Sequence, residues 1–119
     1  MILDGMVKLI QKYKIKTGFG TDLVYGNHIH IGAEFTLRAG YVAAAEVLRQ
    51  ATSESAEVIR LCGKLNRHGN FGEIREGWLA DLILIDGDPT QDITILERAA
   101  ETVVLVMKAG ELVKNLLDR

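Results

Sequence analysis

The chain has 119 residues, of which 48% are hydrophobic and 25% charged, and its formal net charge is −2 at pH 7. This is ordinary globular composition, and a domain of this size buries roughly 65% of the surface of its unfolded chain, so intrinsic disorder is excluded. No apolar run approaches the ~20 residues of a membrane span, and no basic cluster indicates nucleic-acid binding. The N-terminus lacks the pattern of a secretory signal, and the single cysteine, Cys62, forms no internal disulfide. We therefore expect a cytoplasmic protein with neither a membrane nor a nucleic acid as partner.

The first part of the chain predicts helices around one short strand. Apolar residues at i, i+3, i+4 and i+7 predict a helix over residues 3–10, and the chain starts almost inside it, as expected if a preceding segment is missing. Residues 15–19 form a short apolar run that predicts a strand, and residues 23–32, rich in Gly, Asn and His, predict a loop. Helical patterning then resumes over residues 33–39 and, after a glycine, over residues 42–51.

A third helix of this region is predicted from its capping signals. Ser53 is a good N-cap residue, and acidic side chains follow it in the first turn. Val58, Leu61 and Cys62 fall on one face, so we expect them to be buried and the thiol to be inert. Gly63 suits the position just past the end of this helix.

The C-terminal part predicts β structure. Residues 82–85 form a continuous apolar run between turn residues, which predicts a strand covered on both faces. Residues 103–107 predict a second strand, and the Ala109-Gly110 pair before residues 111–113 predicts a hairpin in which the glycine has a positive φ.

Asp22 is the strongest candidate for chemistry. It ends the segment Gly18-Phe19-Gly20-Thr21-Asp22, directly after the predicted strand. A carboxylate just past the carboxyl end of a strand is where α/β barrels place catalytic groups, and it can ligate a cation or accept a proton from water. The simpler interpretation is an aspartate that caps a helix or forms a turn.

Two histidines and a group of aspartates are weaker candidates. His28 and His30 would share one face of an extended segment and offer two imidazoles to zinc, although polar loop histidines are the simpler interpretation. His68 is predicted to lie in a surface turn. The aspartates near the C-terminus lack the spacing of an EF-hand calcium loop, and turn formation explains them more simply. These aspartates are Asp81, Asp86, Asp88 and Asp92.

Taken in order, several segments resemble the C-terminal end of metal-dependent hydrolases of the amidohydrolase superfamily, most of all the imidazolonepropionase-related and Xaa-Pro-dipeptidase-like members. The resemblance covers almost the whole chain. The segments that carry it are Gly20-Thr21-Asp22, residues 34–38, residues 46–52, residues 72–82, Asp86-Gly87-Asp88-Pro89 and residues 106–113.

This resemblance implies an α/β fold, namely the C-terminal portion of a (β/α)₈ barrel over residues 1–63 and part of a small β-sandwich over residues 64–119. Residues 15–22 would be the eighth strand, and Asp22 would contact the metal and carry the proton from the attacking water to the leaving group. The implied cofactor is a divalent metal, zinc in particular, and the implied substrate is a small amide or dipeptide-like molecule. His28 and His30 inherit no role, because the His-x-His pair of the family lies on the first strand.

The chain is nevertheless much shorter than such a barrel, which needs about 250 residues. A catalytic zinc takes three protein ligands, and only Asp22 matches a ligand of the family. We therefore expect a C-terminal fragment of a hydrolase acting on carbon–nitrogen bonds, inactive as an isolated chain. The alternative is a non-catalytic module that self-associates into a homo-oligomer through the unpaired edges of residues 15–19. A third interpretation is an independent metal-binding protein that uses Asp22, His28 and His30.

Overall fold

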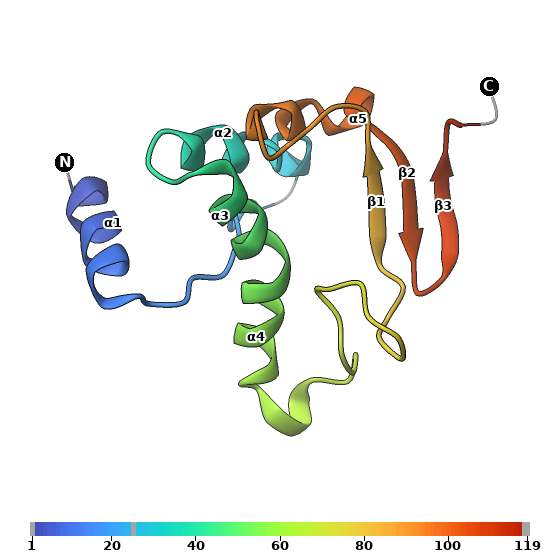
Figure 1. Ribbon diagram of the computed structural model, residues 1–119, viewed down its shortest axis with the longest axis horizontal. Helices are drawn as coiled ribbons and strands as arrows, with labels where there is room; N and C mark the ends of the chain where they lie inside the picture. Colours follow the sequence, from blue (N-terminus) through green and yellow to red (C-terminus); the bar gives the residue numbers. More distant parts are fainter. Residues whose placement is uncertain (1, 25, 118–119) are drawn as a thin grey trace.

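The computed structural model describes residues 2–24 and 26–117, apart from the side chains of residues 2, 3 and 28 (Figure 1). Helices occupy the first part of the chain, and a three-stranded antiparallel sheet in the order β1-β2-β3 occupies the C-terminal part, so the prediction of a mixed α/β fold is confirmed. The elements are α1 (Ile2–Tyr13), η1 (Asn27–His30), α2 (Ala33–Ala39), α3 (Ala44–Arg49), η2 (Gln50–Glu54), α4 (Ser55–Arg60), η3 (Gly63–Leu65), β1 (Leu82–Ile85), η4 (Ile93–Arg98), α5 (Ala99–Thr102), β2 (Val103–Lys108) and β3 (Glu111–Asn115).

The segment after α1 is irregular, and the prediction of a strand over residues 15–19 is wrong for this structure. A strand exists only where a neighbouring strand accepts and donates its backbone hydrogen bonds. Figure 1 shows that the sheet lies at the opposite end of the molecule from α1, and that the segment after α1 runs to the helices in the middle and not to the sheet. Residues 15–19 therefore have the composition of a strand without the neighbour that would make them one.

One continuous helical rod runs from α3 through η2 to α4, and it contains a π-helical turn over Gln50–Glu54. Ser53 lies inside this turn, so its predicted role as the cap of a separate helix is wrong. Single π-turns within α-helices are rare, and they occur frequently at functional sites. Gly63 has φ 55°, as expected for a glycine just beyond the end of a helix.

The expected buried face at the end of this rod is largely exposed. Leu61 is 85% exposed, Val58 is 37% exposed and Cys62 is exposed, so the prediction that the thiol is buried is wrong. Helix α4 ends at Arg60. Leu61 and Cys62 therefore lie beyond the helix, and the helical spacing that predicted a shared buried face does not apply to them. In Figure 1 this end of α4 extends away from the rest of the helices.

The sheet confirms the predicted hairpin. β2 and β3 pair in antiparallel fashion, and the connecting residues Ala109 and Gly110 have φ values of 50° and 85°. Two successive positive φ values are typical of the tight hairpin turn that matches the twist of the strands. β1 pairs with β2 alone and forms an edge, and its Ile83 and Leu84 are each 46% exposed. The prediction that this strand is covered on both faces is therefore wrong for these residues.

The core joins the helical part to the sheet. Val47 of α3 is fully buried and packs with Ile93 and Leu96 of η4 and with Val103 of β2. Gly32, just before α2, permits the close approach of η4, because a Cβ there would lie 2.6 Å from the carbonyl oxygen of Glu97. The proposed boundary between residues 1–63 and 64–119 stays a prediction, and the core draws residues from both sides of it.

Among the described residues, none of the helices has the length and apolar character needed to cross a bilayer.

Candidate functional site

Asp22 lies in the irregular segment between α1 and η1, and its side chain is exposed. Its φ of 49° places it in the left-handed region, which aspartate tolerates better than most residues. Its neighbours Thr21 and Leu23 line a shallow cavity of about 480 Å³, together with His30 and Glu34. The carboxylate thus lies at the surface beside a shallow, mostly apolar concavity, in the irregular segment that follows α1.

The histidine motif does not adopt the expected extended conformation. Residues Asn27–His30 form a 3₁₀ turn, in which positions two residues apart point in directions about 240° apart and do not share a face. The His30 side chain is exposed and reaches the cavity beside Thr21, whereas the side chain of His28 lies outside the described residues.

A metal ion in this region would need several His, Cys, Asp or Glu side chains close together. Over residues 2–24 and 26–117, where side chains are described, no group of three or more His, Cys, Asp or Glu side chains is arranged to hold a metal ion. Asp22 supplies a single carboxylate, while a catalytic zinc takes three protein ligands. The described side chains by themselves therefore do not fit a zinc centre.

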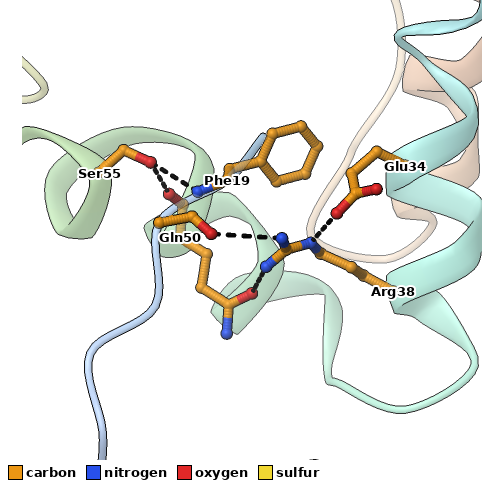
Figure 2. A network of polar contacts seen from close by, with 6 residues as sticks. Phe19, Glu34, Arg38, Gln50 and Ser55 are labelled. Carbon is orange, nitrogen blue, oxygen red and sulfur yellow. Dashed lines mark hydrogen bonds and ion pairs between the residues drawn. The ribbon is translucent and has the colours of Figure 1, made fainter. Parts of the chain in front are cut away.

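A network of polar contacts centred on Arg38 fixes the start of the segment that carries Asp22 (Figure 2). The guanidinium donates from Nε to Glu34 Oε1 at 2.6 Å, from Nη1 to Gln50 Oε1 at 2.6 Å and from Nη2 to the carbonyl oxygen of Gly18 at 3.2 Å. The planar fork of arginine suits such simultaneous bonds to separate acceptors. Arg38 therefore ties α2, the π-turn and the irregular segment together.

Phe19, the residue after Gly18, is hydrogen-bonded to Ser55 at the start of α4. The amide of Phe19 donates to Ser55 Oγ at 2.8 Å, and the Ser55 hydroxyl donates to the carbonyl oxygen of Gln50 at 2.6 Å. The Phe19 ring stacks between Phe35, with ring centroids 4.5 Å apart, and the Arg38 guanidinium, 4.8 Å from its centroid. Sequence analysis missed this network, because the contacts of Arg38 and Ser55 with Gly18 and Phe19 join residues that are far apart in the sequence.

Asp88 and Asp92 accept the local hydrogen bonds of turns, as the simpler interpretation predicted, whereas Asp81 forms an ion pair that the sequence did not predict. Asp88 Oδ1 accepts from the amide and hydroxyl of Thr90 at 2.9 and 2.6 Å, and Asp92 has the same contacts with Thr94, so the pKa of each aspartate is lowered. Asp81 accepts from Lys108 Nζ at 2.5 Å, which lowers the pKa of this carboxyl too.

His68 also lies where the sequence placed it. It is exposed in the loop after α4, and its backbone amide donates to Asn66 Oδ1 at 3.0 Å. The contact is typical of an Asx-stabilised turn.

Comparison with known proteins places this geometry in context. The amidohydrolase family matches residues 3–113. An ochratoxinase from Aspergillus niger is 26% identical over 117 residues, which cover 96% of this chain and 23% of that protein.

Two solved structures share the fold over nearly the whole chain. A prolidase complexed with N-methylphosphonate-L-proline matches with a TM-score of 0.80 and 33% identity, over 94% of this chain and 26% of its own. A Xaa-Pro dipeptidase with bound methionine in its active site matches with a TM-score of 0.76 and 29% identity, over 94% of this chain and 25% of its own.

The chain thus spans about a quarter of the length of the proteins it matches. Within that quarter the similarity is nearly continuous, in sequence and in backbone, from α1 to β3. The chain belongs to the amidohydrolase family.

Proposed function

We propose that these residues form the C-terminal part of a metal-dependent hydrolase that cleaves carbon–nitrogen bonds. The match to the amidohydrolase family over residues 3–113 carries this proposal. Because the chain spans about a quarter of its relatives, the activity of the whole enzyme needs groups from outside these 119 residues. We expect the isolated chain to be inactive.

The proposed substrate is a small molecule with an amide or dipeptide-like bond, handled by an enzyme of the imidazolonepropionase-related and Xaa-Pro-dipeptidase-like branch. The prolidase complexed with N-methylphosphonate-L-proline and the Xaa-Pro dipeptidase with bound methionine support this class. Both structures are similar to this chain over 94% of its length.

The proposed architecture assigns residues 15–22 to the eighth strand of a (β/α)₈ barrel within residues 1–63, and residues 64–119 to a small β-sandwich. Two observations support it. The segment 15–19 has strand composition but no strand neighbour among the described residues, and the edge strand β1 leaves Ile83 and Leu84 half exposed. Further strands would cover these surfaces and satisfy their backbone groups.

Asp22 is the proposed catalytic residue and one ligand of the metal. Its carboxylate would accept a proton from the attacking water and return it to the leaving nitrogen, which is general base and then general acid catalysis by one group. The metal, proposed to be zinc, would polarise the carbonyl and acidify water, with its other ligands supplied by the remaining part of the barrel.

The test is a hydrolysis assay on the protein at its natural length, with added zinc and a panel of N-acyl amino acids and Xaa-Pro dipeptides. We expect Asp22→Asn to lower kcat by about 10²–10⁴-fold, the usual contribution of a general acid–base group. Asp86→Asn is the matched control, because Asp86 is an exposed aspartate in the turn after β1. Equal activity in the two variants would contradict the role of Asp22.

A second candidate is the non-catalytic, self-associating module. It is favoured by large exposed apolar side chains around the irregular segment, namely Met6, Leu9, Tyr13 and Ile15, each more than half exposed. A second copy covering them would remove apolar surface from water. Light scattering on the 119-residue chain is expected to give a dimer or larger species, and a monomer of 13.1 kDa would rule this candidate out.

A further inference from the structure

The backbone polar groups of residues 18 and 19 are satisfied by side chains of the surrounding helices. The Gly18 carbonyl accepts from Arg38 and the Phe19 amide donates to Ser55, so these two groups have side-chain partners whichever strands pair with the rest of the segment. Gly18 is exposed and Phe19 is half-buried, and these two side-chain bonds tie this part of the segment to the surrounding helices. Asp22 follows four residues after Gly18 on the same segment.

Arg38 and Ser55 bind the backbone of residues 18 and 19, and we call this pair of side chains the clamp. Arg38 is the more extensively bonded of the two. Its side chain is 20% exposed and that of its partner Glu34 is 15% exposed, so their pairing is shielded from water. Gln50, which accepts from Nη1, is only 5% exposed. With Nε and both Nη atoms engaged and its face on the Phe19 ring, the guanidinium has one defined orientation (Figure 2).

The π-turn supplies the second half of the clamp. Gln50 begins this turn, and its carbonyl oxygen accepts from the Ser55 hydroxyl five residues later. The same hydroxyl accepts a hydrogen bond from the backbone amide of Phe19, so Ser55 links the π-turn to the irregular segment after α1. A regular helix at this point would use the carbonyl of Gln50 for its own backbone bond at i+4.

We propose that Arg38 and Ser55 are positioning residues, which place the Asp22 carboxylate for proton transfer by fixing the backbone of residues 18 and 19. The inference rests on the function proposed for Asp22 and adds the residues that direct it. Neither Arg38 nor Ser55 touches the reacting atoms in this account. A displacement of about 1 Å at a catalytic group can lower a rate about 10²-fold, so loss of the clamp has a measurable kinetic effect.

The kinetic test is a double-mutant cycle at natural length with the dipeptide assay. Arg38→Met is expected to lower kcat about 10–100-fold with KM nearly unchanged, and to change it less than about 2-fold in an Asp22→Asn background, because Arg38 acts through Asp22. Arg38→Lys is not expected to restore the rate, since one ammonium cannot reach three separated acceptors. Arg49→Met is the matched control, because Arg49 forms an exposed ion pair with Glu46 on the helix surface.

An equal loss in both backgrounds, or full restoration by lysine, would overturn the positioning role. Full activity of Asp22→Asn would refute the proposed function, and the positioning role with it. Full activity of Arg38→Met beside an inactive Asp22→Asn would refute the positioning role alone. Ser55→Ala gives a second, milder variant of the clamp if Arg38→Met does not fold.

A readout independent of activity is available in the 119-residue chain. The amide chemical shifts of residues 20–22 are expected to move in Arg38→Met and in Ser55→Ala, and to stay unchanged in Arg49→Met. Unchanged shifts in both clamp variants would overturn the proposal.

Discussion

At the scale of single residues, Asp81 shows how one carboxylate secures the hairpin. Its two oxygens accept from Lys108 Nζ at 2.5 Å and from the amide of Ala109 at 2.7 Å, at the point where β2 enters its turn. Both contacts favour the charged form, the one with Lys108 more strongly, and so lower the pKa of Asp81 below its ordinary value of 3.8. A group whose folded pKa is lowered stabilises the fold above its unfolded pKa.

We expect wild-type protein to be more stable than Asp81→Asn above about pH 4, and this advantage to shrink as the pH falls through and below 3.8 towards the folded pKa. Urea unfolding of both proteins at several pH values between 2 and 7 measures the difference. An advantage that stays constant down to pH 2 would show that the charge on Asp81 is not responsible.

Asp22 shows what local sequence can and cannot predict at this scale. The Gly-Phe-Gly-Thr-Asp segment identified it as a candidate, and the structure describes it as an exposed residue with a positive φ. Arg38 and Ser55 carried no comparable signal, because they meet Gly18 and Phe19 only after the helices have packed. The environment of a candidate residue depends on tertiary contacts that no local spacing records.

At the scale of elements, the loop before β1 is anchored on the helical rod by a close approach and by an aromatic ring. Trp78 lies between the guanidinium groups of Arg60 and Arg75, which are 5.6 and 5.0 Å from its ring centroid. Gly72 has φ 94°, and a Cβ there would lie 2.5 Å from the Cβ of Ala56. The loop therefore reaches α4 only because residue 72 lacks a side chain.

Gly72→Ala is expected to destabilise the protein by about 2–4 kcal/mol, because it combines an unfavourable φ with overpacking against a fully buried alanine. Gly77→Ala is the matched control, since Gly77 has a similar φ of 79° with no atom within 4 Å of the added Cβ. Urea unfolding of the two variants separates the two effects. Equal losses in both would show that the close approach to α4 contributes nothing.

Element prediction succeeded where the signal was local. Helical periodicity predicted α1 and α2, and the Ala109-Gly110 pair predicted the turn between β2 and β3. It failed at residues 15–19, where strand composition needs a neighbour from elsewhere, and at Ser53, where a capping residue lies within a continuous helix. The first failure comes from the need for a strand neighbour, which periodicity does not read, and the second from the continuation of the helix through a π-turn.

At the scale of the whole molecule, the exposed apolar surfaces fit a chain that spans about a quarter of its relatives. A cavity of about 810 Å³ lies between α1 and the helices that follow, lined by apolar residues such as Val7, Ile10 and Leu37. The edge strand β1 exposes two further large side chains at the other end of the molecule. In the proposed enzyme, the remaining barrel and sandwich would cover these surfaces.

A crystal structure of the protein at its natural length, grown with zinc, tests the central claim most directly. The account predicts that residues 15–22 lie between neighbouring strands, that Gly18 and Phe19 keep their bonds to Arg38 and Ser55, and that the Asp22 carboxylate faces a cavity that contains the metal. A structure in which this segment stays unpaired, with Asp22 in solvent away from any metal, would contradict the account.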